Sequence, residues 1–306
     1  MLAAALGAGL PRLQVAPLAY ADLVSPPRLR LLLERHGLWA RRRLGQNFLV
    51  DANVVARIVA ASGVGPGDAV FEVGPGLGVV TRPLAERAAR VVALELDQRL
   101  FPALEETLAG LGNVQVVQGD ILRADLRTIL GAGPWKVVAN LPYYVTTPAL
   151  ARLLEHDDLF GRMTLMVQRE VADRLAAEPG GREYGALSVF VQSRRQVSRA
   201  FTVSPTSFYP APKVESAVVV LDPLPAPVVP AGCEADFEVG VRAAFGQRRK
   251  RLGNALALAL GVASGGVDEA LTQAGIDPGL RAEALSVAQY VAVASVVRRL
   301  REEAAA

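Results

Sequence analysis

Short apolar runs alternate with helix-length segments over the first two thirds of the chain. Continuous apolar runs are typical of strands that are buried on both faces of a sheet. Alternation of such strands with helices is typical of a parallel sheet covered by helices. We therefore predict an α/β fold with a doubly wound, mainly parallel sheet. The predicted strands span residues 69–73, 91–95, 114–117, 136–139 and 163–167.

Two further strands are predicted at residues 196–203 and 213–221. The loop between them, residues 204–212, contains no helical pattern. Strands joined by a short loop of this kind pair in antiparallel fashion, whereas a parallel pair needs a crossover. We therefore expect an antiparallel element at one edge of the sheet.

The last quarter of the chain has a different pattern. Residues 223–232 form a Pro-rich stretch, which is typical of a connector. Residues 233–306 show helical periodicity and no convincing strand. A chain of 306 residues suits two domains. We predict a sheet domain at 25–222, a connector at 223–232 and a small all-helical domain at 233–306.

The first 24 residues are rich in Ala and Leu and low in charge. No basic segment precedes their apolar stretch, and Pro11 and Arg12 interrupt it, which is unlike a secretory signal. Ser25 can then cap a helix that has proline in its first turn. We expect residues 1–24 to form a flexible extension.

The composition is that of a soluble globular protein, with 51% hydrophobic and 21% charged residues. No apolar segment reaches the roughly 18 residues that a membrane helix needs. The single cysteine, Cys233, excludes an internal disulfide framework, and no Cys/His group has the spacing of a metal site. We expect a cytoplasmic protein that binds no metal and has no membrane association.

Positive charge is clustered, although the net charge is only +3. Clustered Lys and Arg are what a polyphosphate partner requires, so we predict nucleic-acid binding. The clusters lie at residues 41–43, 194–195, 248–251 and 298–299. Within the third, the predicted RNA-binding residues are Arg248, Arg249, Lys250 and Arg251.

A glycine-rich turn follows the first predicted strand. Gly74 and Gly76 would let the backbone turn tightly and approach a ligand closely. Val79 stands where a dinucleotide fingerprint needs Gly or Ala, which disfavours a nicotinamide dehydrogenase. Glu95, Asp120 and Asn140 then follow three successive strands. Such polar strand ends form an adenosine-shaped groove, and the loop has no Lys for a phosphate. S-adenosylmethionine fits this groove.

The segment Asn140-Leu141-Pro142-Tyr143-Tyr144 follows the fourth predicted strand. In open α/β sheets, ligands bind outside the carboxyl ends of strands. An amide, backbone carbonyls and an aromatic face at this place suit a flat, nitrogen-bearing substrate such as a nucleobase. We expect Tyr143 to stack on the base and Tyr144 to pack in the core.

Several motifs together resemble the small-subunit ribosomal RNA adenine dimethyltransferases, from about residue 25 to the C-terminus. They are residues 46–49 (QNFL), 72–78 (EVGPGLG), 118–120 (QGD), 140–143 (NLPY), 207–216 (SFYPAPKVES) and 244–252 (AFGQRRKRL). The resemblance implies a Rossmann-like class I methyltransferase sheet and a helical RNA- and ribosome-binding domain. It also implies methyl transfer from S-adenosylmethionine to N6 of two adjacent adenosines. These lie in a hairpin loop near the 3′ end of 16S rRNA in the immature 30S subunit.

The resemblance also implies roles for individual residues and a part in late small-subunit assembly, and we expect a monomer. Asn140, Leu141 and Tyr143 would address the target base, with Pro142 stiffening the turn and Phe208 stacking on the other face of the base. The cofactor would contact Asn47, Leu49, Gly74, Gly76, Glu95, Asp120 and Asn140.

Two other functions stay open at this point. One is a 23S-directed adenine methyltransferase of the macrolide-resistance type, which would methylate naked 23S RNA. The other is a non-catalytic RNA-binding assembly or transcription factor on the same fold. That second function predicts a degraded cofactor pocket, whereas Glu95, Asp120 and Asn140 are all present.

Overall fold

The computed structural model describes residues 23–41, 45–247 and 249–305. The predictions made for residues 1–22, for Arg42 and Arg43 and for Arg248 therefore lie outside the described residues. In the described part, no helix is both long and apolar enough to cross a bilayer.

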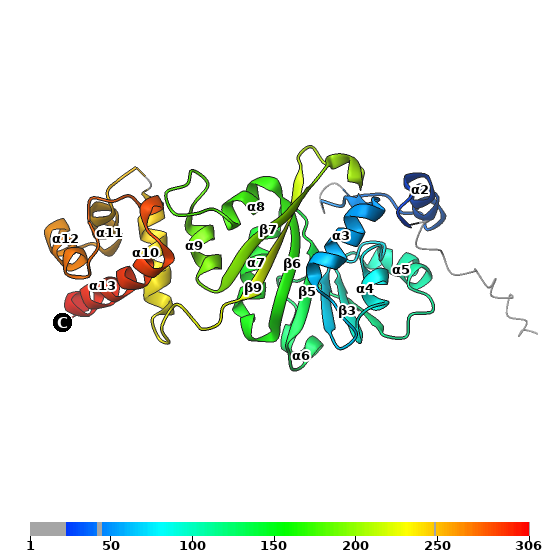
Figure 1. Ribbon diagram of the computed structural model, residues 1–306, viewed down its shortest axis with the longest axis horizontal. Helices are drawn as coiled ribbons and strands as arrows, with labels where there is room; N and C mark the ends of the chain where they lie inside the picture. The colour runs from blue at the N-terminus through cyan, green and yellow to red at the C-terminus, as the bar shows by residue number, and fades with distance from the viewer. Residues whose placement is uncertain (1–22, 42–44, 248, 306) are drawn as a thin grey trace, which may run out of the picture.

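The centre of the molecule is a seven-stranded sheet with the order β4-β3-β2-β5-β6-β9-β7 (Figure 1). Neighbouring strands from β4 to β6 are parallel, and β9 pairs antiparallel with both β6 and β7. The predicted parallel sheet with an antiparallel element at one edge is therefore confirmed. The strands are β2 (Ala69–Val73), β3 (Arg90–Glu95), β4 (Val114–Gln118), β5 (Trp135–Asn140), β6 (Phe160–Gln168), β7 (Arg195–Val203) and β9 (Ser216–Pro223).

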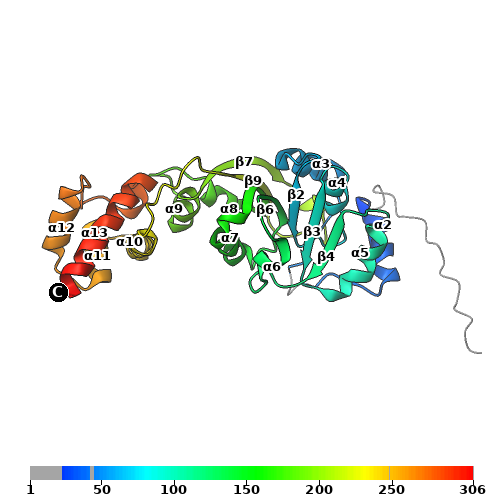
Figure 2. The ribbon, with the colours of Figure 1, turned by 90° about the horizontal axis from the view of Figure 1, so that it is seen from below.

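Helices cover both faces of the sheet, which explains why the parallel strands are continuously apolar. Side chains alternate along β2, so that Val70 joins one apolar cluster while Phe71 and Val73 join the other. Figure 2 shows α3 and α4 on one side of the strands and α6 and α7 on the other. The first face carries α2 (Pro26–Arg35), α3 (Ala52–Ser62), α4 (Thr81–Ala85) and α5 (Phe101–Thr107). The second carries α6 (Leu126–Leu130), α7 (Thr146–Glu155), α8 (Arg169–Leu175) and α9 (Ala186–Gln192).

A small second sheet joins two segments that lie far apart in the sequence. Strand β1 (Phe48–Leu49) pairs antiparallel with β8 (Phe208–Tyr209), with Leu49 opposite Phe208. Asp51 caps α3, and its second carboxylate oxygen accepts a hydrogen bond from the Ser207 hydroxyl at 2.8 Å. These contacts hold the chain before α3 against the loop that follows β7.

The C-terminal part is all-helical and lies at the end of the molecule opposite α2 (Figure 1). It consists of α10 (Glu234–Gly246), α11 (Leu252–Leu260), α12 (Ser264–Gln273), the short η5 (Ala282–Ala284) and α13 (Val287–Ala305). Its apolar core also takes in Tyr184 and Val189, which precede the connector. The Phe190 and Phe237 rings meet edge to face at 6.3 Å, so the helical part packs directly on α9.

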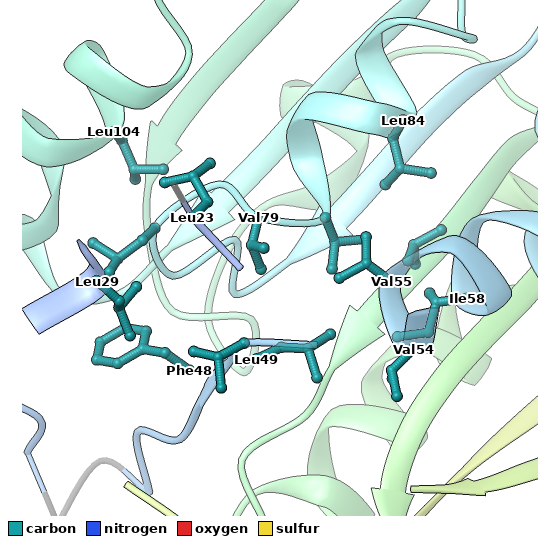
Figure 3. Close-up of a cluster of buried hydrophobic side chains, with 14 of the residues drawn as sticks. Leu23, Leu29, Phe48, Leu49, Val54, Val55, Ile58, Val79, Leu84 and Leu104 are labelled. Carbon is teal, nitrogen blue, oxygen red and sulfur yellow. The ribbon is translucent and has the colours of Figure 1, made fainter. Parts of the chain in front are cut away.

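The described part of the chain starts with a buried residue that the sequence places in the N-terminal extension. Leu23, which the sequence places within it, has only 1% of its surface exposed and packs with Leu29 and Leu104 (Figure 3). A leucine just ahead of a helix gives no periodic signal of its own, and only the packed structure reveals its burial. Leu23 therefore belongs to the packed part of the chain.

Arg195 was expected to contribute to a basic surface cluster, and that prediction is wrong. Its side chain is fully buried. Its Nε donates to Asp157 Oδ1 at 2.6 Å, and its terminal nitrogens donate to the backbone carbonyls of Asp157, Phe160 and Gly161. The guanidinium therefore ties the start of β7 to the chain that enters β6.

Arg195→Met is expected to lower the free energy of unfolding by about 3–5 kcal/mol, because three carbonyls lose a charged donor and Asp157 loses its partner. Chemical denaturation followed by circular dichroism measures this loss. Arg194→Met is the matched control, since Arg194 is exposed and should change stability by less than about 0.5 kcal/mol. Equal stability of the two variants would show that the buried network contributes nothing.

Candidate active site

A cavity of about 250 Å³ opens at the carboxyl ends of the parallel strands. It lies where the chain order reverses between β2 and β5, the place where ligands bind in open α/β sheets. All residues that the sequence assigns to the cofactor and base sites line it. They are Asn47, Leu49, Gly74, Gly76, Glu95, Asp120, Asn140, Leu141, Pro142, Tyr143 and Phe208.

The glycine-rich turn after β2 forms the floor of the cavity. Gly76 and Gly78 have φ angles of 60° and 79°, which residues other than glycine rarely adopt. A Cβ atom at Gly78 would lie 2.9 Å from Leu108 Cδ2, so the turn also packs tightly against the end of α5. Gly74 sits beside Asn140, with an added Cβ falling 3.9 Å from the Asn140 carbonyl oxygen. The turn thus meets the end of β5.

Glu95 ends β3 and connects two parts of the cavity wall. Its Oε2 accepts a hydrogen bond from the Gly76 N–H at 3.2 Å, and its Oε1 accepts from the Asp97 N–H at 2.8 Å. Burial raises the pKa of Glu95, and the two backbone donors oppose that rise. The carboxylate therefore holds the glycine turn in place and presents acceptor oxygens to the cavity.

The polar loop before β1 is fixed by Gln46, a residue to which the sequence assigned no role. Its amide nitrogen donates to Asp97 Oδ2 at 3.0 Å, and its amide oxygen accepts from the Arg41 N–H at 2.9 Å. Burial works to raise the pKa of Asp97, but hydrogen bonds from Arg99 and Gln46 outweigh it and lower the pKa. Gln46 belongs to the motif of residues 46–49, but its contact with Asp97, 51 positions away, could be seen only in three dimensions.

Asp120 and Asn140 complete the polar rim. Asp120 Oδ1 accepts a hydrogen bond from the Leu122 N–H at 3.0 Å, which closes the turn after β4. The Asn140 side chain makes no hydrogen bond within the described part of the chain, although it lines the cavity. Its amide is therefore available to a ligand, as a substrate-binding amide must be.

The residues after Asn140 form a rigid loop. The Leu141 N–H donates to the Met166 carbonyl at 3.1 Å, which anchors the loop to β6. The Pro142 carbonyl accepts from the Val145 N–H at 3.0 Å and from the Thr146 hydroxyl at 3.2 Å. The Tyr143 hydroxyl lies 2.8 Å from Ser216 Oγ on β9, so the ring is held at both ends.

The expectation that Tyr144 packs in the core is wrong. Its side chain is 53% exposed and lines the mouth of the cavity beside Gly45. Tyr143 is half-buried and bonded to β9, whereas Tyr144 is exposed at the same loop. Sequence alone could not distinguish two adjacent tyrosines, because the direction of a loop side chain depends on the turn.

Phe208 lines the same cavity from β8. It is only 4% exposed and belongs to the apolar cluster that also contains Phe48 and Leu49. Its place follows from the pairing of β1 with β8, which sets Phe208 opposite Leu49. The cavity therefore has an aromatic side chain from the loop after β5 and another from β8.

Three of the predicted RNA-binding residues, Arg249, Lys250 and Arg251, lie elsewhere, between α10 and α11. Arg249 and Lys250 are exposed there, while Arg251 lies 3.6 Å from the Asp268 carboxylate. Arg298 is also paired, with Asp236 at 3.0 Å. Among the described residues of this segment, Arg249 and Lys250 are thus the best placed to meet phosphates.

Known proteins resemble this chain over most of its length. A family model described as ribosomal RNA adenine dimethylase matches residues 37–299. The ribosomal RNA small subunit methyltransferase A of Geobacter sulfurreducens is 48% identical over 261 residues, covering 84% of this chain and 95% of that protein. Its counterpart from Moorella thermoacetica is 47% identical over 286 residues, covering 90% and 99%.

Solved structures share the fold. The crystal structure of the 23S rRNA methyltransferase ErmE has a TM-score of 0.67 and 28% identity, covering 82% of this chain and all of that one. A dimethyladenosine transferase from Plasmodium falciparum also has a TM-score of 0.67, with 24% identity over 80% of this chain and 95% of that chain. The predicted class I methyltransferase sheet is therefore confirmed. Together with the family model and the 48% identical relative, these findings show that the chain belongs to the ribosomal RNA adenine dimethylase family.

Proposed function

We propose that this protein transfers methyl groups from S-adenosylmethionine to N6 of two adjacent adenosines in the 3′-terminal hairpin loop of 16S rRNA. The observation that carries the proposal is the single cavity in which Glu95, Asp120 and Asn140 meet Tyr143 and Phe208. The small-subunit names of relatives at 47–48% identity favour 16S over 23S rRNA as the substrate.

The cavity fits the proposed cofactor. Glu95 and Asp120 end neighbouring strands, where carboxylates can accept hydrogen bonds from a ribose and from an adenine amino group. The glycine turn leaves room for close approach of a ligand, and Asn47 and Leu49 close the same cavity from β1 and the residue before it. When bound, S-adenosylmethionine supplies an electrophilic methyl group.

The loop after β5 suits the chemistry of an adenine amine. The N6 lone pair is delocalised into the ring, so the amine is a poor nucleophile. Acceptors on its two N–H groups favour a more tetrahedral nitrogen and stabilise the positive charge that develops there. The side-chain oxygen of Asn140 and the carbonyl of Leu141 are the proposed acceptors. The methylated amine is acidic enough to lose its proton to water, so no strong general base is required.

Two aromatic side chains would hold the base in line with the methyl donor. Tyr143 is fixed by its 2.8 Å contact with Ser216, and Phe208 is fixed by the β1–β8 pairing. Stacking of a base on an aromatic ring is worth about 1–3 kcal/mol. The adenosine must leave its stack to enter the cavity, and a single-stranded loop makes that step inexpensive.

The proposal extends to the biological setting. The RNA is bound within the immature 30S subunit, the methylation belongs to late small-subunit assembly, and the protein acts as a monomer in the cytoplasm. Arg249 and Lys250 are exposed on the helical part, away from the cavity. They would bind RNA phosphates there while the cavity holds the base.

Arg249→Glu or Lys250→Glu is expected to weaken RNA binding and to flatten its salt dependence by about one unit of the log–log slope, because each change removes a phosphate contact. Fluorescence anisotropy at several salt concentrations measures both effects. Arg87→Glu makes the same charge change at the end of α4 and should leave the slope as it is. Equal slopes for all three variants would remove this segment from the interface.

A substrate competition separates this function from its alternatives. Labelled methyl donor is supplied with naked 23S RNA and with immature 30S particles. We expect label in the 30S particles; label mainly in 23S RNA would favour the macrolide-resistance type, to which the ErmE similarity also points. Binding of RNA with no transfer to either substrate would favour a non-catalytic assembly factor.

A further inference from the structure

The cavity has an unusual charge composition. Among the described residues that line it there are three carboxylates, Glu72, Glu95 and Asp120, and no Lys, Arg or His. Carboxylates in an apolar-walled cavity of this kind favour a cation over a neutral or anionic ligand. Glu95 and Asp120 have roles in the proposed function, whereas Glu72 has none.

Glu72 lies beneath the glycine turn. It is on the same face of β2 as Val70, the face covered by α3 and α4, and it is only 3% exposed. Its Oε2 finds no hydrogen-bond partner among the described residues, and the same holds for the Thr81 hydroxyl on α4. A buried carboxylate without a partner is costly, so this group needs either a proton or a positively charged neighbour.

In the protein alone, the surroundings of Glu72 favour its protonated form. Burial raises its pKa to about 8 and the Glu95 carboxylate adds to the rise, while the nearby Thr81 hydroxyl, which lies outside hydrogen-bond geometry, opposes it. The other titratable groups facing the cavity are Asp120 after β4 and the two tyrosines after β5, and none of them is a cation. A cationic ligand would reverse this balance.

We propose that Glu72, one of the three carboxyl groups lining this cavity, loses its proton to solvent when the cationic methyl donor binds. The inference rests on the proposed function, because it takes S-adenosylmethionine as the ligand. The sulfonium group of that donor carries a positive charge, which the thioether product S-adenosylhomocysteine lacks. Ionised Glu72 would therefore favour the donor over the product, and the preference would grow as the pH rises.

The first test is calorimetric titration of the intact protein with S-adenosylmethionine at pH 7, in two buffers of different ionisation enthalpy. With a pKa of about 8, Glu72 is about nine-tenths protonated at pH 7, so its ionisation releases about 0.9 protons per bound ligand. Glu72→Gln should abolish most of that proton release and weaken binding of the donor about tenfold. Binding of the product should be weakened less. Glu86→Gln, an exposed carboxyl at the end of α4, should behave as the wild type.

The second test needs no variant. The two ligands share the same amino-acid group, so its titration cancels in the ratio of their association constants. That ratio should rise by up to tenfold per pH unit between about pH 6 and pH 8 and level off above pH 8. A flat ratio, or unchanged proton release in Glu72→Gln, would overturn the inference while leaving the proposed function intact. Failure of the wild type to bind S-adenosylmethionine would instead overturn the proposed function.

Discussion

Asn140→Ala is expected to lower the single-turnover rate of methyl transfer by about 10²–10³-fold, the loss typical of removing one donor or acceptor aimed at developing charge. The Asn140 amide lines the cavity and makes no hydrogen bond within the described part of the chain, so its removal leaves no protein group unpaired. Folding and RNA affinity should therefore stay close to those of the wild type. Rapid-quench assays with labelled donor measure the rate, and anisotropy measures the affinity.

Asn53→Ala is the matched control for this change. Asn53 is an exposed asparagine in the first turn of α3 and lies outside the cavity lining. Its substitution removes the same atoms and should leave the rate unchanged. If Asn140→Ala kept the wild-type rate, the amide would have no part in activating the amine. If it lost RNA binding in proportion to the rate, its role would be in docking rather than in chemistry.

Glu95→Ala is expected to weaken S-adenosylmethionine binding by about 10- to 100-fold, the range that follows from losing charged hydrogen bonds worth about 1.5–3 kcal/mol. Two effects add. The proposed ribose acceptor disappears, and the N–H groups of Gly76 and Asp97 lose the carboxylate that now holds them. Calorimetry measures the affinity directly.

The control for Glu95 is Glu105→Ala, because Glu105 is an exposed carboxyl on α5. It should bind the cofactor as the wild type does. Glu95→Gln adds a further distinction, since it keeps the size of the side chain but not its charge. If Glu95→Ala bound S-adenosylmethionine as tightly as the wild type, neither the ribose contact nor the hydrogen bond to the glycine turn would contribute to cofactor binding.

The parallel sheet could be predicted from the sequence because its signal is local. Strands β2, β3, β5 and β6 are largely buried, and each therefore appears as a short, mostly apolar run, whereas β4 lies at the edge of the sheet and has exposed glutamines. The positions of Glu95, Asp120 and Asn140 follow from the same pattern, since each lies at or just after the end of a strand. Parallel strands end at one edge of the sheet, and this rule brings the three residues into one cavity without further information.

The rest depended on contacts between distant segments. Strands β1 and β8 are two residues each and are too short to show alternation, so the pairing that sets Phe208 opposite Leu49 had no local sign. Arg195 looked like surface charge, because nothing near it in sequence reveals the carbonyls of Phe160 and Gly161. Glu72 looked like part of a glycine motif. Only the structure shows that its side chain is buried and that its Oε2 has no hydrogen-bond partner among the described residues.

The most direct test of the proposed function is the identity of the methylated nucleoside. Small-subunit particles that lack the modification are incubated with the purified protein and S-adenosylmethionine, and the RNA is digested and analysed by mass spectrometry. We predict N6,N6-dimethyladenosine at two adjacent positions of the 3′-terminal hairpin loop, and its near absence with Asn140→Ala. Particles that stay unmodified, or that carry the methyl groups on another base, would contradict the proposed function.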